Sequence, residues 1–133
     1  MTAQPIHVAI LDDEPAIRTA LGRLLKAAGM VVRAYATGDQ LFESIAQERP
    51  DCLLLDLQMP EMSGLDVLKH LGQRHIHIPV IIITGQNNEN SREACMNAGA
   101  FAYLLKPLDS YLLIETIKII RGKPQREALP SLI

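Results

Sequence analysis

The stretch PDCLLLDLQMPEMSG, residues 50–64, decides how this chain folds. Residues 52–55 form an apolar run that is too short for a helix, and such a run is typical of a strand buried on both faces. Asp56 follows directly, before a loop marked by proline and glycine. Ligands of parallel α/β sheets bind just outside the carboxyl ends of the strands. Asp56 is therefore placed for chemistry, although an isolated aspartate here would more often be a loop or helix-cap residue.

The composition bounds the class of protein. The chain has 133 residues, enough for one domain with a real core, and 48% of them are hydrophobic. A formal charge of −2 gives no general surface for nucleic acid or anionic membrane, so we expect this domain to bind neither directly. Cys52 and Cys95 lie in a strand-like and a helix-like segment, where reduced core thiols fit a cytoplasmic protein. We find no signal-peptide pattern and no apolar segment of membrane-spanning length.

Apolar strands alternate with amphipathic helices along the chain. We expect five strands, at residues 6–11, 31–35, 51–56, 79–84 and 101–105. We expect five helices, at residues 15–28, from 37, from 63, at 90–99 and from 109 or 110 to 121. This alternation with short loops predicts an α/β fold with a doubly wound parallel sheet. Right-handed crossovers would bring the carboxyl ends of all strands to one edge.

Polar residues typical of helix caps precede several of these helices. Asp13 is a candidate cap for the first helix, and Ser63 for the third. Thr37 with Gln40, and Asn90 with Glu93, have the spacing of a capping box.

Five chemically active side chains follow the predicted strands. Asp12 and Asp13 come after the first strand, Asp56 after the third, Thr84 ends the fourth, and Lys106 follows the fifth. Three carboxylates at one edge repel one another, so we expect a hard cation such as Mg²⁺ among them. The lysine and the hydroxyl suit an anionic group. Together these groups are what a phosphoryl group needs when a carboxylate attacks it.

These residues stand in motifs of a known family. Residues 5–121 resemble the receiver domain of two-component response regulators. The resemblance is carried by LDDEP at 11–15, DLQMPEMSG at 56–64, ITG at 83–85 and YLLKP at 103–107. It implies a flavodoxin-like fold: a doubly wound sheet of five parallel strands with five helices.

The resemblance also implies a phosphoacceptor and its metal site. Asp56 would accept a phosphoryl group from a sensor histidine kinase or a phosphotransfer protein. Mg²⁺ would be bound by Asp12, Asp13, Asp56 and the backbone carbonyl of Gln58. Gln58 and Gln86, two residues after Asp56 and Thr84, would tune the lifetime of the phosphoryl group.

A switch is implied as well. Thr84 and Lys106 would bind the phosphoryl oxygens, and the rotamer of Tyr103 would report phosphorylation. The Lys106–Pro107 peptide bond is expected to be cis.

The last predicted helix carries more apolar residues than one buried stripe needs. Seven of them surround its axis: Tyr111, Leu112, Leu113, Ile114, Ile117, Ile119 and Ile120. A helix that is apolar all round is usually covered on more than one side, so we expect a partner surface and a phosphorylation-dependent homodimer. An output domain covering this helix is the competing explanation.

We expect a receiver domain over residues 1–121, followed by a tail or the start of an interdomain linker at 122–133. The chain would then be a stand-alone receiver or part of a longer regulator whose output domain or effector is unknown. We expect no enzyme with an external substrate, only phosphotransfer to the domain itself and its autodephosphorylation.

Two other functions fit the residues less well. A magnesium-dependent phosphohydrolase of the haloacid-dehalogenase type also forms an aspartyl phosphate, but Asp12-Asp13-Glu14 does not supply the DxDx[TV] arrangement of that family. A degenerate receiver that serves only as an interaction module would lack an aspartate, the threonine or the lysine, and none is missing here.

Overall fold

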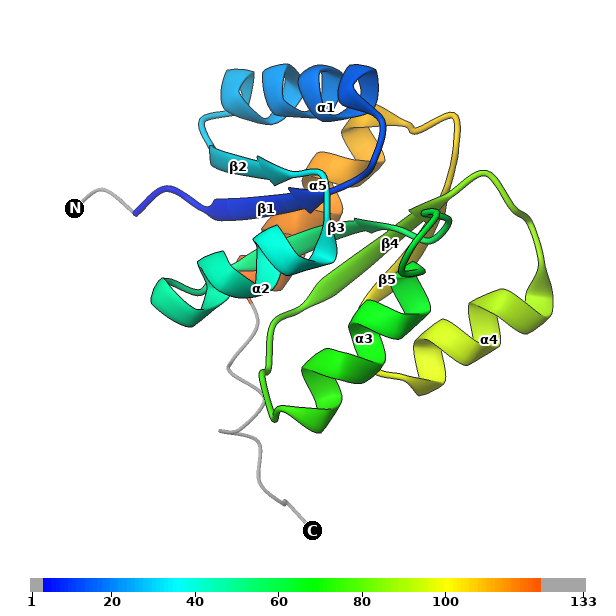
Figure 1. Cartoon of the computed structure of the whole chain (residues 1–133). Coiled ribbons are helices and arrows are strands. Elements are labelled where there is room, and N and C mark those ends of the chain that lie inside the picture. Colours follow the sequence, from blue (N-terminus) through cyan, green and yellow to red (C-terminus); the bar gives the residue numbers. More distant parts are fainter. Residues whose placement is uncertain (1–3, 123–133) are drawn as a thin grey trace, which may run out of the picture.

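A computed structural model describes residues 4–122 and shows the expected alternation of strands and helices (Figure 1). The strands are β1 (His7–Leu11), β2 (Val31–Tyr35), β3 (Cys52–Asp56), β4 (Val80–Thr84) and β5 (Ala102–Leu105). The helices are α1 (Pro15–Ala27), α2 (Gly38–Gln47), α3 (Gly64–Gln73), α4 (Glu89–Asn97) and α5 (Ser110–Gly122). The predicted elements are all present, with boundaries shifted by one or two residues at most of their ends. Residues 122–133, predicted to form a tail, lie outside the described residues apart from Gly122.

The five strands form one parallel sheet in the order β2-β1-β3-β4-β5. This order confirms the doubly wound parallel sheet predicted from the sequence and the flavodoxin-like fold that the family resemblance implied. The chain moves first to one side of β1 and then to the other, so the order reverses between β1 and β3. The carboxyl ends of these two neighbouring strands flank the crevice where ligands of such sheets bind.

Alternation along the buried strands creates two apolar layers. One set of strand side chains, which includes Leu11, Leu55 and Ile82, packs with buried residues of α2, α3 and α4. The alternate set, which includes Ile10, Leu54 and Ile83, packs with α1 and α5. The helices therefore cover both faces of the sheet (Figure 1), and the central strand β3 is buried along its whole length.

The helix starts agree only in part with the sequence predictions. Ser63 forms a capping box with Asp66, and the Thr37 hydroxyl accepts a hydrogen bond from the backbone N–H of Gln40. The prediction that Asp13 caps α1 was wrong. The residue before this helix is Glu14, the helix begins with a proline, and no side chain caps it.

The cap predicted at Asn90 was also wrong. Asn88 caps α4 two residues earlier, by accepting a hydrogen bond from the backbone N–H of Ser91. Asparagines occupy three of the four positions 87–90, so composition alone did not fix the boundary.

No helix within residues 4–122 is long and apolar enough to cross a membrane.

Candidate functional site

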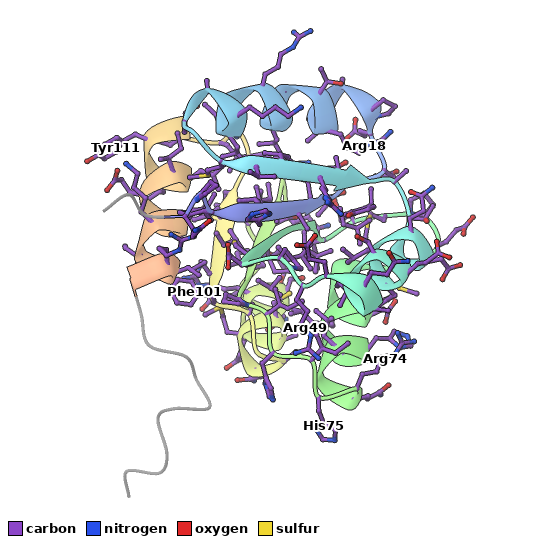
Figure 2. All side chains as sticks on the ribbon, turned by 90° about the vertical axis from the view of Figure 1, so that its left-hand side faces the viewer. Arg18, Arg49, Arg74, His75, Phe101 and Tyr111 are labelled. Atoms are coloured by element: carbon purple, nitrogen blue, oxygen red, sulfur yellow. The ribbon has the colours of Figure 1, made fainter. Side chains whose placement is uncertain are left out.

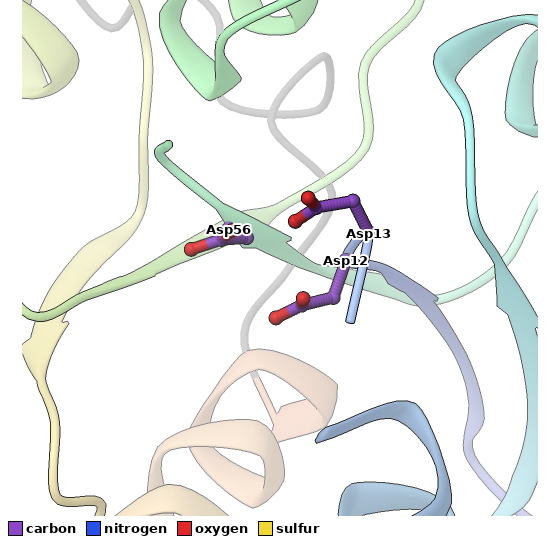
Figure 3. Close-up of side chains that lie close together, drawn as sticks. All are labelled: Asp12, Asp13 and Asp56. Atoms are coloured by element: carbon purple, nitrogen blue, oxygen red, sulfur yellow. The ribbon is translucent and has the colours of Figure 1, made fainter. Parts of the chain in front are cut away.

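Three carboxylates meet at the carboxyl ends of β1 and β3 (Figure 3). Asp12 and Asp13 directly follow β1, and Asp56 is the last residue of β3. One carboxylate oxygen from each residue lies within 4.8 Å of those of the other two. The parallel pairing of Leu11 with Leu55 brings these residues together from distant parts of the sequence.

Burial and mutual repulsion disfavour the charged forms of two of these acids. Asp12 and Asp56 are buried, whereas Asp13 is half-buried. Burial, with the negative charge of Asp12 as the next cause, raises the pKa of Asp56 to about 6. Burial also raises the pKa of Asp12. The backbone N–H of Glu14, which donates to the Asp12 carboxylate at 2.9 Å, has the smaller, opposite effect and lowers that pKa. The protein alone leaves this cluster short of positive charge.

Lys106 forms a direct ion pair with two acids of the cluster. Its Nζ lies 3.6 Å from Asp56 Oδ1 and 3.9 Å from Asp12 Oδ2. It follows β5, and its backbone N–H donates to the Thr84 carbonyl at 2.8 Å. The Lys106–Pro107 peptide bond is cis, as predicted. One lysine does not neutralise three carboxylates. A divalent cation that prefers oxygen ligands therefore fits this donor set.

Thr84 lies at the end of the strand next to Asp56. In the sheet Asp56 of β3 is paired with Ile83 of β4, and Thr84 is the next residue of β4. Its side chain is completely buried, and its hydroxyl accepts a hydrogen bond from the backbone N–H of Gln86 at 3.1 Å. A hydroxyl that accepts one hydrogen bond can still donate its own proton to a second oxygen.

Tyr103 lies on β5, the next strand of the sheet, where it is paired with Ile82 of β4. Its ring is buried in the same apolar layer as Cys95 of α4. The phenol donates a hydrogen bond to the backbone carbonyl of Gln86 at 3.2 Å. The backbone of Gln86 therefore contacts both the Thr84 hydroxyl and the Tyr103 hydroxyl.

The loop between β3 and α3 holds Asp56 from the other side. A hydrogen bond from the backbone of Gln58 lowers the pKa of Asp56, against the larger effect of burial. The Gln58 and Gln86 side chains are exposed and line one open groove between this loop and α4. Metal ligation by the Gln58 carbonyl stays a prediction, as do the lifetime roles of both glutamines.

Sequence reasoning missed one charged residue that touches the site. Arg18, on the first turn of α1, is half-buried and donates from Nη1 to the backbone carbonyl of Asp12 at 2.8 Å. Figure 2 shows it beside the first helix. Its position on the first turn of the helix that leaves the acidic strand end placed it near the site, but residue spacing does not determine the contact itself.

The whole domain matches a known protein family. The family model of the response regulator receiver domain matches residues 8–118. The DNA-binding transcriptional regulator NtrC of Escherichia coli (strain K12) is 40% identical over 102 residues, which cover 77% of this chain and 22% of that protein. The response regulator MprA of Mycobacterium ulcerans is 35% identical over 124 residues, which cover 93% of this chain and 52% of that protein. The chain thus spans between about a fifth and a half of these relatives.

Solved structures share the fold over nearly the whole chain. The structure described as FixJ-N is 32% identical, has a TM-score of 0.83, and covers 98% of this chain and 100% of its own. A putative response regulator from Chloroflexus aurantiacus J-10-fl is 29% identical, has a TM-score of 0.82, and covers 90% of this chain and 100% of its own.

Proposed function

Because this chain belongs to the response regulator receiver domain family, a family of regulatory domains, we propose that it is a switch controlled by phosphorylation of Asp56. The observation that carries the proposal is the meeting of a buried carboxylate, two further acids and a lysine at one sheet edge. We further propose that a sensor histidine kinase or a phosphotransfer protein is the donor. The proposed receiver covers residues 1–121.

In the proposed reaction an Asp56 carboxylate oxygen attacks the phosphorus of a phosphohistidine. An O–P bond forms and the P–N bond of the donor breaks; the imidazole leaves with the electron pair and takes a proton from water. Asp56 needs to be ionised to attack, and at neutral pH most of it is, since its pKa lies near 6. Later attack of water on the aspartyl phosphate would return the domain to its resting form.

Mg²⁺ is the proposed cofactor, held by Asp12, Asp13, Asp56 and the Gln58 carbonyl. When bound, it supplies positive charge that offsets the developing charge on the phosphoryl oxygens. Lys106, whose Nζ lies 3.6 Å from Asp56, would pair with a phosphoryl oxygen after the transfer.

The proposed switch runs through Thr84 and Tyr103. The buried Thr84 hydroxyl would donate its proton to a phosphoryl oxygen while it still accepts from Gln86. Tyr103, whose hydroxyl bonds to the same residue, would report the change at the face formed by α4, β5 and α5.

That face is the proposed site of phosphorylation-dependent homodimerisation. Of the seven apolar residues of α5, Leu113, Ile117 and Ile120 are buried in the core and Ile114 packs partly against it. The other three are exposed, as is Leu105 on the adjacent β5. We call these four residues, Leu105, Tyr111, Leu112 and Ile119, the α5 patch. Figure 2 shows Tyr111 projecting outward from its helix.

The longer relatives suggest what kind of output the receiver controls. NtrC is described as a DNA-binding transcriptional regulator, and this chain matches about a fifth of it. We propose that the receiver described here controls an output domain or a separate effector, with no DNA contact of its own, in the cytoplasm.

Magnesium-dependent labelling by acetyl phosphate, a small phosphodonor, tests the proposed function. Intact-mass measurement should show addition of one phosphoryl group with Mg²⁺ present, and none when EDTA removes the ion. Equal labelling in both conditions, or no labelling by either acetyl phosphate or phosphorylated histidine kinases, would reject it.

A further inference from the structure

Helix α4 has little apolar packing to hold it in place. Its sequence, ENSREACMN, is mostly polar, and Cys95 is its only fully buried residue. The other helices on the same face bury three or four residues each. A helix with few buried apolar contacts depends more on individual polar contacts for its position.

Arg92 makes such a contact, from α4 to β5. Its guanidinium carbon lies 5.6 Å from the centre of the Tyr103 ring, within the range of a cation–π interaction. Its Nη1 also donates to the backbone carbonyl of Tyr103, at a long 3.4 Å. Arg92 is exposed, whereas Tyr103 is 6% exposed. One side chain of α4 therefore contacts both the ring and the backbone of the residue proposed to switch.

The Tyr103 carbonyl is available because β5 is an edge strand. Alternate residues of a parallel strand direct their backbone groups to the same neighbour. The N–H of Lys106 bonds to Thr84 on β4, so residue 103, three positions earlier, directs its carbonyl to the open edge. Arg92 covers this edge carbonyl with a charged donor.

We propose that Arg92 is a positioning residue that clamps Tyr103 in its inward orientation and thereby couples the position of α4 to that of β5. The ring is then held at two points, by Arg92 over its face and by Gln86 at its hydroxyl. Loss of Arg92 frees the ring and α4 together, while the acidic cluster at the β1 and β3 ends keeps its contacts. The role in signalling rests on the function proposed above; the clamp itself does not.

The clamp is tested in the unphosphorylated, metal-free protein. Fluorotyrosine labelling gives one ¹⁹F resonance for each of the three tyrosines, assigned by Tyr→Phe replacement. A soluble paramagnetic agent should relax exposed Tyr111 strongly and buried Tyr103 weakly, which provides an internal scale. Arg92→Ala should increase relaxation of Tyr103 about threefold to tenfold, as expected for loss of one cation–π contact.

Two variants serve as controls. Arg74→Ala removes another arginine–aromatic contact, in which the guanidinium lies 4.5 Å from the Phe42 ring centre, and should leave Tyr103 unchanged. Arg92→Lys keeps the charge and should restore part of the protection. If Tyr103 is equally protected in Arg92→Ala and in the wild type, the clamp is wrong.

A second measurement separates the clamp from a direct role of Arg92 in partner contact. With beryllofluoride, which mimics the phosphoryl group on Asp56, Arg92→Ala should weaken self-association, with no further loss in a Tyr103→Leu background. Weaker association with unchanged Tyr103 relaxation would make Arg92 a simple interface residue and reject the clamp. Failure of the wild-type protein to accept a phosphoryl group would reject the proposed function, whereas the metal-free relaxation result would still decide the clamp.

Discussion

Asp13 is the least buried of the three clustered acids. Its negative charge raises the pKa of both Asp12 and Asp56, although burial is the larger cause for each of them. Removal of this carboxylate should therefore relieve repulsion in the metal-free protein and at the same time remove one proposed ligand of Mg²⁺.

Asp13→Ala should keep or slightly raise the thermal stability without metal and should lose the stabilisation by Mg²⁺. For the wild type, a metal concentration one hundred times its dissociation constant would add about 2.7 kcal/mol. Thermal melts with and without the ion measure both effects. Glu14→Ala, which removes the exposed neighbouring charge, is the control and should respond to Mg²⁺ like the wild type. An Asp13→Ala variant stabilised by Mg²⁺ as much as the wild type would exclude Asp13 as a ligand.

The raised pKa of Asp56 predicts a pH dependence of stability. Its pKa rises from 3.8 to about 6 on folding, so the folded state binds the proton more tightly than the unfolded state does. Its favourable contribution is complete below pH 3.8 and is lost as the pH rises through about 6, by on the order of 3 kcal/mol. The Asp56→Asn variant should not show this loss of stability, because the asparagine side chain does not titrate. In urea titrations with EDTA, the stability of the variant relative to the wild type should increase between pH 4 and pH 7.5; a constant difference would contradict the assigned pKa.

The sequence alone predicted which residues gather at the site, because a parallel sheet brings its strand ends to one edge. Asp12, Asp13, Asp56 and Lys106 were predictable on that ground, and the structure brings them together. The contacts of the arginines were not predictable in this way. Whether a long side chain reaches a carbonyl depends on the rotation of its helix and on its rotamer, which residue spacing does not determine.

Among the elements, the loop from β3 to α3 has the tightest steric constraint at the site. Gly64, the first residue of α3, is buried, and its N–H donates to the Leu57 carbonyl at 2.8 Å. A Cβ built at Gly64 would lie 2.6 Å from the Asp56 carbonyl oxygen and 2.9 Å from the Leu57 Cα. Both of these are backbone atoms, so the loop cannot accept a side chain here without moving Asp56.

Gly64→Ala should therefore destabilise the domain by about 1–3 kcal/mol and slow its phosphorylation. Gly72→Ala on the same helix is the matched control, since a Cβ there meets nothing within 4 Å. It should be neutral or stabilising by up to about 1 kcal/mol, because alanine favours a helix. Urea unfolding and acetyl phosphate labelling measure the two effects. A Gly64→Ala protein with unchanged stability and labelling rate would show that the loop relaxes freely.

Element types were predictable because the apolar runs and the helical stripes are distinct in this chain, whereas the capping residues were predictable only in part. Several residues near each start can cap a helix, and tertiary packing selects among them. At α1 the selected start has no side-chain cap, and the Asp12 carboxylate accepts a hydrogen bond from the backbone N–H of Glu14, the residue just before the helix.

In the molecule as a whole, the α5 patch is a group of large apolar residues on α5 and β5 that the fold leaves exposed within residues 4–122. Tyr111 is 74% exposed and Ile119 53% exposed. A contiguous apolar surface on a small domain often marks an interaction site. The sequence predicted excess apolar residues on this helix but could not separate those that enter the core from those that remain outside.

Phosphorylation should convert the domain from monomer to dimer at tens of micromolar protein. Sedimentation with and without beryllofluoride measures the change. Ile119→Asp should abolish the dimer, because it places a charge in the α5 patch. Val31→Asp, an exposed apolar position on the edge strand β2, is the control and should still dimerise. A monomer in both states would reject phosphorylation-driven dimerisation and favour an output domain as the occupant of the patch.

The identity of the modified residue is the most direct test of the proposed switch. The protein is incubated with acetyl phosphate and Mg²⁺, the aspartyl phosphate is reduced with borohydride, and the adduct is mapped by peptide mass spectrometry. We expect modification of Asp56 alone, and none in Asp56→Asn. Modification of Asp12 or Asp13 in the wild type, or full labelling of Asp56→Asn, would contradict the assignment.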